Sequence, residues 1–146
     1  MKITCLVNNF SKNKDLIDEH GLSFYIEKDT KKILFDTGLE KALFHNAKAL
    51  NIDLTDIDYV VLSHSHNDHT GGLSEFLKIN SKAKVIAHKE VFLEKFSKRT
   101  GEMKFIGLSK EGLDLKRFEF IEDNYKLNQN IFLYGNLGDY EEARET

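Results

Sequence analysis

The chain has 146 residues, 40% of them hydrophobic, which is enough for one domain whose core folds without disulfides. The net charge is −3 with both signs interspersed, so the sequence predicts neither a nucleic-acid partner nor a membrane partner. The single cysteine, Cys5, excludes an internal disulfide and fits a reducing compartment. Because the N-terminus also lacks the long apolar region of a signal peptide, we expect a cytoplasmic protein.

The first part of the chain alternates strand and helix patterns. Apolar residues at every second position predict strands at 3–7, 22–26 and 32–36, the last two as a hairpin. Apolar residues at three- and four-residue spacing then predict an amphipathic helix over 39–51. A polar turn leads into the near-continuous apolar run at 59–63, which is typical of a strand that is covered on both faces.

The second part predicts shorter elements and a basic patch. The patch, at 95–99, is either a solvated helix end or a place that receives an anionic substrate group. The acidic tail at 138–146 has few apolar residues and should be frayed. The remaining elements that we expect are a short helix from Leu73, a strand at 84–87, a helix over 91–96, and strands of a meander at 104–106, 115–121 and 131–134.

The apolar run at 59–63 ends in a loop that carries four potential metal ligands within six positions. If the backbone stays extended there, His64 and His66 point to the same side and converge on one ion. A turn after Asn67 then brings Asp68 and His69 to the same open space, where they supply a neighbouring ion. The sequence therefore predicts a metal site at the end of a buried strand.

The types of ligand restrict the metal. Imidazole with carboxylate suits zinc and also iron or manganese, whereas calcium and magnesium sites are built almost wholly of oxygens. We therefore expect one or two zinc ions, with iron or manganese as alternatives. His45 and His88 are isolated from other ligands, and we expect no metal at either of them.

Asp36 ends a predicted buried strand, where an unpaired carboxylate would be costly, so it should be hydrogen-bonded. One interpretation makes Asp36 an acceptor behind the metal ligands, which fixes the orientation of a ligand histidine. The other makes Asp36 or Thr37 the cap of the following helix, and the two roles are compatible.

Two motifs resemble those of a known family. The His-x-His-x-Asp-His pattern at 64–69 resembles the signature of the metallo-β-lactamase fold superfamily, and Phe-Asp-Thr-Gly at 35–38 resembles its upstream aspartate motif. The stretches at 19–24, 32–38 and 56–64 are similar to one branch of it. This branch includes the 7,8-dihydropterin-6-yl-methyl-4-(β-D-ribofuranosyl)aminobenzene 5′-phosphate synthase and many metal-dependent hydrolases. The chain resembles about the first half of such proteins, and their later histidines and metal-bridging aspartate have no counterpart here.

The resemblance implies an α/β (α+β) fold that is the N-terminal half of a metallo-β-lactamase-like αββα sandwich, in one partial domain over 1–146. Helices would cover one face of its sheet. The other face would be left open, because this sequence does not encode a second sheet, and soluble monomers rarely tolerate a large open apolar face. We therefore expect either a homodimer or a missing C-terminal half.

The resemblance also implies metal-dependent hydrolysis of a small, anionic metabolite. His64 and His66 would hold one ion, Asp68 and His69 the second, and Asp68 would also be catalytic by accepting or delivering a proton at the metal-bound water. Two alternatives stay open: a transferase or synthase in pterin cofactor biosynthesis, and a truncated, non-catalytic metal-binding half-domain.

The pair Glu19 and His20 precedes the strand at 22–26 and has two interpretations. The first is a solvated loop. The second, implied by the similar glutamate-histidine-glycine stretch of the branch, is a pair that faces the substrate at the mouth of the site.

Overall fold

The computed structural model of the protein describes residues 1–98 and 101–135. The tail predicted at 138–146 lies outside the described residues, as does Arg99 of the basic patch. In chain order the elements are β1 (Lys2–Val7), β2 (Ser23–Lys28), β3 (Lys31–Phe35), α1 (Ala42–Ala49), η1 (Leu54–Asp56), β4 (Tyr59–Val61), α2 (Asn67–Thr70), α3 (Leu73–Ile79), β5 (Lys84–His88), β6 (Phe96–Ser97), β7 (Lys104–Phe105), η2 (Leu115–Arg117), β8 (Phe118–Ile121), β9 (Tyr125–Asn128) and β10 (Ile131–Leu133).

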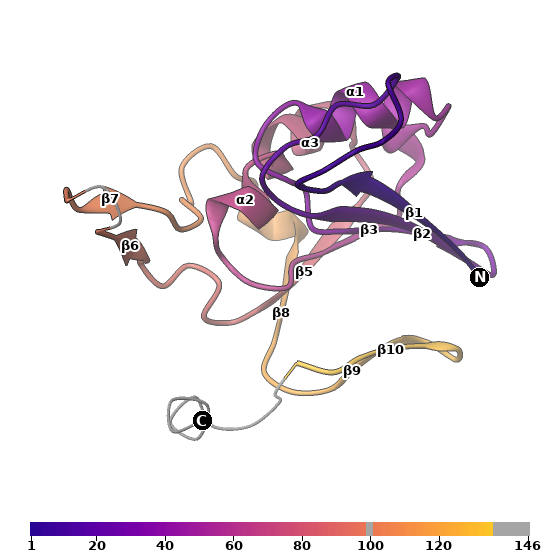
Figure 1. Ribbon diagram of the computed structural model, residues 1–146. Coiled ribbons are helices and arrows are strands. Elements are labelled where there is room, and N and C mark those ends of the chain that lie inside the picture. Colours follow the sequence, from indigo (N-terminus) through magenta and orange to yellow (C-terminus); the bar gives the residue numbers. More distant parts are fainter. Residues whose placement is uncertain (99–100, 136–146) are drawn as a thin grey trace, which may run out of the picture.

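A six-stranded sheet in the order β1-β2-β3-β4-β5-β8 forms the centre of the protein (Figure 1). The strands β1, β2 and β3 pair antiparallel, whereas β3, β4, β5 and β8 are parallel. Leu34, Val60 and Val85 lie side by side across the three central strands, and all three are fully buried. Parallel strands of this kind are found in sheets covered on both faces. The predicted α/β class is confirmed.

The helices α1 and α3 lie on the same face of this sheet (Figure 1). Leu43 of α1 and Phe76 of α3 are fully buried and belong to one apolar cluster with Val60 and Val85. Burial of such side chains is the main stabilising contribution to this layer. Among the described residues, no helix is both long and apolar enough to span a bilayer.

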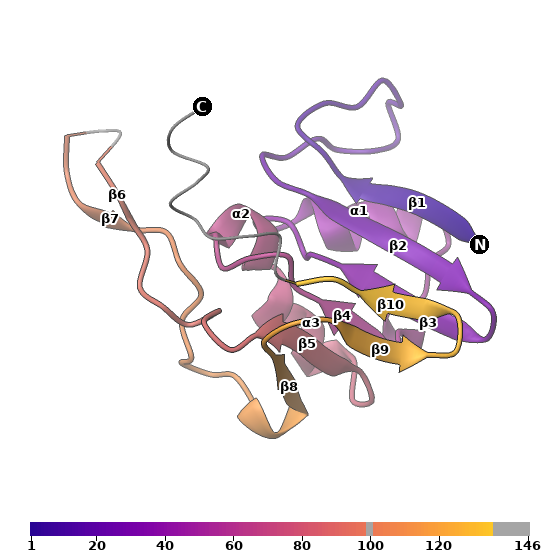
Figure 2. The same cartoon turned by 90° about the horizontal axis from the view of Figure 1, so that it is seen from below.

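The opposite face of the sheet is covered at its centre by the hairpin of β9 and β10 (Figure 2). Ile33, Val61 and Ile86 form a second apolar cluster there, and Leu127 and Ile131 of the hairpin pack against it. The prediction that this whole face is left open is therefore wrong. The cover is only partial, because a cavity of about 250 Å³ remains between β10 and the sheet.

The helix predicted over 91–96 does not form. The N–H groups of Val91 and Leu93 each donate to the carbonyl three residues earlier, so the chain makes turns before it enters β6. Val91 is buried, and the ring of Phe92 lies 5.5 Å from that of Phe118, centroid to centroid. Contacts with the sheet therefore outweigh the helical tendency of this short apolar run.

The strand predicted at 115–121 begins only at Phe118, because the first three residues form the 3₁₀ helix η2. The Arg117 guanidinium donates to main-chain carbonyls at and after the end of α3, among them Leu77 and Asn80, and this holds η2 against that end. Strand β9 is absent from the predicted elements. The predicted meander is also wrong, since β8 joins the parallel sheet while β9 and β10 form a separate hairpin.

Candidate metal centre

The predicted metal loop lies where two neighbouring parallel strands, β3 and β4, end. Asp36 follows β3 directly, and Ser63 follows β4 by two residues. The short helix α2 starts just after His66 and carries Asp68 and His69. Crevices at the carboxyl ends of parallel strands are the usual ligand sites of open α/β sheets.

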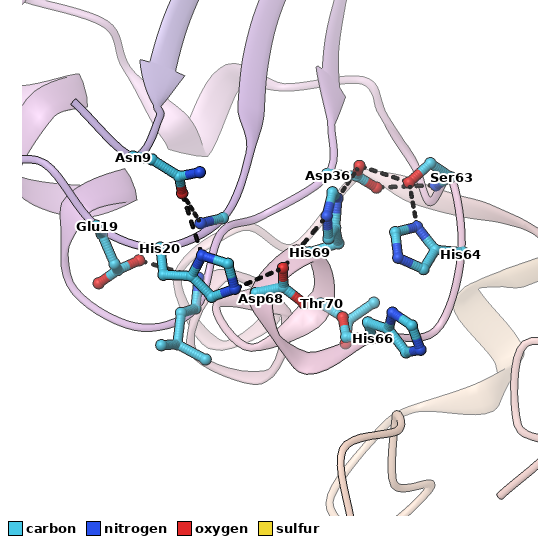
Figure 3. Close-up of polar contacts among 12 residues, drawn as sticks. Asn9, Glu19, His20, Asp36, Ser63, His64, His66, Asp68, His69 and Thr70 are labelled. Atoms are coloured by element: carbon cyan, nitrogen blue, oxygen red, sulfur yellow. Dashed lines mark hydrogen bonds and ion pairs between the residues drawn. The ribbon is translucent and has the colours of Figure 1, made fainter. Parts of the chain in front are cut away.

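Three histidine rings gather in this loop (Figure 3). Strand β4 ends at Val61, so the backbone at 62–66 is not the extended strand that was predicted. The alternation of sides remains, because Ser65 is buried while His64 and His66 face outward. The centroid of the His64 ring lies 4.7 Å from that of His66 and 4.2 Å from that of His69. The structure thus brings the three predicted imidazole ligands together.

Asp36 is fully buried behind these rings, and its carboxylate accepts three hydrogen bonds. Its Oδ1 accepts from the Ser63 N–H at 2.8 Å, and its Oδ2 accepts from the Ser63 hydroxyl at 2.6 Å and from His69 Nδ1 at 2.8 Å. Because the carboxylate can only accept, His69 carries its proton on Nδ1 and presents the lone pair of Nε2 as a possible metal ligand. Asp36 therefore orients the ring of His69, and its role behind a metal ligand stays a prediction.

Ser63 sets the tautomer of a second ring. Its hydroxyl proton is donated to Asp36, so its oxygen accepts from His64 Nδ1, which lies 2.9 Å away. His64 then also presents Nε2 to the open space. Desolvation of the His64 ring, with the nearby His69 and His66, lowers the pKa of His64, which favours the neutral form that binds metals.

Asp68 supplies the carboxylate of the site. Its side chain is 19% exposed, and its Oδ2 lies 3.5 Å from His69 Nε2 and 3.4 Å from His20 Nε2. His64 and His66 thus lie on one side of His69, and Asp68 and His20 on the other (Figure 3).

These side chains have the chemistry of a metal centre without forming a closed one. In the described ranges 1–98 and 101–135, no three histidine, cysteine, aspartate or glutamate side chains are arranged so that they could hold one ion together. Imidazole nitrogens and a carboxylate at the ends of parallel strands fit zinc, iron or manganese by type of ligand. The types of side chain therefore fit the predicted metals. The side chains lie next to one another in an open row and do not surround a single point.

Glu19 lies beside this site and has a structural role. Its two carboxylate oxygens accept from four successive main-chain N–H groups, those of residues 39–42, at the start of α1. Partial burial alone would raise the pKa of Glu19, but these four hydrogen bonds lower it overall. Neither the solvated-loop interpretation nor the substrate-facing one describes Glu19, because its carboxylate is occupied as the cap of a helix.

Sequence reasoning missed two residues that support the site, Ser63 and Asn9. Ser63 could have been found, because a hydroxyl next to a ligand histidine at a strand end is well placed to bond its ring. Asn9 could not: its amide oxygen contacts His20 and Gly21, eleven and twelve positions later in the chain.

The metallo-beta-lactamase superfamily model matches residues 16–128, and the chain belongs to this superfamily. It is 36% identical, over 155 aligned positions, to the 7,8-dihydropterin-6-methyl-4-(beta-D-ribofuranosyl)-aminobenzene-5′-phosphate synthase of Methanocaldococcus jannaschii, and the match covers 97% of this chain and 52% of that protein. An uncharacterized protein of the same organism is also 36% identical, over 91% of this chain and 52% of its own length. The chain thus spans about half the length of these curated relatives.

Solved structures agree with this assignment. A crystal structure of a metal-dependent hydrolase of the beta-lactamase superfamily superposes with a TM-score of 0.69 at 29% identity, over 90% of this chain and 46% of that one. The Rm3 metallo-beta-lactamase, at 19% identity and a TM-score of 0.56 over 80% of this chain and 45% of its own, shares the fold. The predicted family and the predicted partial metallo-β-lactamase-like fold are confirmed.

Proposed function

We propose that this protein is a metal-dependent hydrolase that acts on a small, anionic metabolite through metal-activated water. The observation that carries the proposal is the gathering of His64, His66, Asp68 and His69 at the ends of β3 and β4. Hydrogen bonds from the Nδ1 atoms of His64 and His69 leave Nε2 of both rings for a metal. The superfamily match and the hydrolase structure at 29% identity support it.

The metal we propose is zinc, as one or two ions, with iron or manganese as alternatives. His64 and His66 would hold one ion, and Asp68 and His69 the second. A bound ion supplies a water whose pKa is lowered toward neutrality and polarises the group that is cleaved. Asp68 would bind the ion through one oxygen, and its other oxygen would accept a proton from the bound water or deliver it to the leaving group.

The hairpin of β6 and β7 supports an anionic substrate. It carries Lys98 and Lys104, projects past α2 (Figure 1), and is joined to the metal loop by the main chain. The Asn67 N–H donates to the Ile106 carbonyl at 2.9 Å, and the Ile106 N–H donates to the Lys95 carbonyl at 2.8 Å. Lysine side chains on a hairpin that is tied to the metal loop would favour substrates that carry a phosphate or carboxylate.

Two other functions have support of their own. The relative named as a dihydropterin synthase, at 36% identity, favours a synthase or transferase in pterin cofactor biosynthesis. The open row of ligands favours a non-catalytic metal-binding half-domain. We also propose that a second copy of the chain, or a further C-terminal half, completes the second layer. A cytoplasmic location is proposed as well, and the single cysteine supports it.

Metal uptake and turnover separate these functions. The protein is loaded with zinc, manganese or iron, its metal content is measured by elemental analysis, and it is assayed with a phosphodiester, a lactone, and a dihydropterin plus an aminobenzene ribosyl phosphate. Hydrolysis of the first two supports the hydrolase, condensation of the last pair the synthase, and bound metal without turnover the half-domain.

The same experiment includes matched variants. His66→Ala and Asp68→Ala should lose most of the metal, whereas His45→Ala should keep it, because the His45 ring contacts the Asp15 carbonyl outside the metal loop. Equal losses in all three variants, or no metal uptake by the unmodified protein at any concentration, would contradict the proposed centre.

A further inference from the structure

The segment Glu19-His20-Gly21-Leu22 is distant from the metal loop in sequence but packs directly on Asp68. Glu19 anchors one end of the segment on the main chain of residues 39–42. At the other end, the Leu22 carbonyl accepts from the Gly38 N–H at 3.0 Å, in the loop that follows Asp36. The segment is therefore held at both ends by the loop that runs from β3 to α1.

The main chain of this segment touches the main chain of Asp68. The Leu22 N–H donates to the Asp68 carbonyl at 3.3 Å. Gly21 has a φ of +140°, and a Cβ added to it would lie 2.1 Å from the Asp68 carbonyl oxygen. A residue with a side chain would push the two segments apart, so only glycine allows this approach.

The side chain of His20 continues the contact. Asn9 Oδ1 accepts from the Gly21 N–H at 3.0 Å and lies 3.2 Å from His20 Nδ1, so Nδ1 carries a proton and donates it to Asn9. This bond fixes the ring plane and places Nε2 3.4 Å from Asp68 Oδ2 (Figure 3). Asn9, His20 and Asp68 thus form a chain of contacts between two loops and α2.

We propose that His20 is a positioning residue for Asp68, with Asn9 holding the ring. His20 restrains the Asp68 carboxylate through Oδ2, so Asp68 keeps one side-chain rotamer beside His69. Partners behind a ligand that fix its orientation contribute roughly 10–100-fold to metal affinity. This inference rests on the proposed function for its metal, but the contact itself does not depend on a metal being bound.

Two substitutions separate the contacts of the two ring nitrogens. The amide of His20→Asn can reach Asn9, as Nδ1 does, but is too short to reach Asp68. The amide of His20→Gln can reach Asp68, as Nε2 does. The first measurement uses the metal-free protein: three-bond NMR couplings report whether Asp68 keeps a single χ1 rotamer. We expect one rotamer in the unmodified protein and in His20→Gln, and averaging in His20→Asn.

The second measurement is the affinity for cobalt(II), which is monitored through the absorption spectrum of the bound ion. We expect His20→Asn to weaken binding by about 10-fold and His20→Gln to bind nearly as the unmodified protein does. In an Asp68→Ala background, neither substitution should have a further effect.

The outcomes are distinct. An unchanged Asp68 rotamer in His20→Asn overturns the proposal. An equal loss of cobalt affinity in both variants makes His20 a direct ligand and overturns it as well. If the rotamer changes as expected but the unmodified protein binds no cobalt, the positioning role stands and the proposed metal centre fails.

Discussion

Asp36 shows how one buried carboxylate can organise a site from behind. It connects Ser63 and His69, and through Ser63 it reaches His64, so two of the three loop histidines depend on it for their orientation. In Asp36→Asn, one oxygen can still accept from the Ser63 N–H, but the amide nitrogen cannot accept from His69 Nδ1. We expect metal affinity to fall by roughly 10–100-fold, as measured by competition with a coloured chelator.

The control for this prediction is His45→Ala, which removes an imidazole outside the metal loop and should leave the affinity unchanged. If Asp36→Asn binds metal as tightly as the unmodified protein, the orientation of His69 does not depend on this hydrogen bond.

Strand β5 shows how one element serves both layers. Val85 and Ala87 point into the cluster under the helices, whereas Ile86 between them is fully buried in the cluster under the β9–β10 hairpin. We expect Ile86→Ala to lower the free energy of unfolding by roughly 2–5 kcal/mol, because it leaves a cavity in the cluster that the hairpin covers. Urea unfolding followed by circular dichroism measures this.

The matched control for Ile86 is Ile79→Ala. Ile79 is 49% exposed at the end of α3, and its truncation should change stability by no more than about 0.5 kcal/mol. Similar small effects from both variants would mean that the hairpin does not cover Ile86 in solution.

In the part of the chain that the structure describes, the sheet has a helical layer on one face and a partial layer on the other. Helices cover one face of the six-stranded sheet, and a two-stranded hairpin covers the centre of the other, where Phe132 of β10 is 50% exposed. We propose that a second copy completes this layer in an isologous dimer, and an interface of roughly 2,000 Å² or more is expected of an obligate dimer. Sedimentation of dilute protein should then give a dimer.

Phe132→Glu should shift this dimer to a monomer, because it places a charge in an apolar interface. Phe10→Glu is the control, since Phe10 is 65% exposed in the loop after β1, away from the hairpin. A stable monomer of the unmodified protein would contradict the dimer and favour a further C-terminal half as what completes the layer.

The central strands, the α/β class, the family and the grouping of residues 64–69 could be predicted from the sequence alone, because each depends on a short stretch of the chain. A period of two predicts a strand wherever it occurs, and four ligands within six positions must lie close together in any fold. The hydrogen bonding of Asp36 could be predicted for the same local reason, since a carboxylate at the end of a buried strand needs a partner.

Only the tertiary structure decided the features that join residues distant in the chain. The Glu19 carboxylate caps main chain about twenty positions later, and His20 meets Asp68 across two loops. The turns at 91–96 and the cover of Ile86 by the hairpin depend on contacts with later strands. The sequence pattern of one segment does not predict such partners, because these contacts form only when the sheet brings distant segments together.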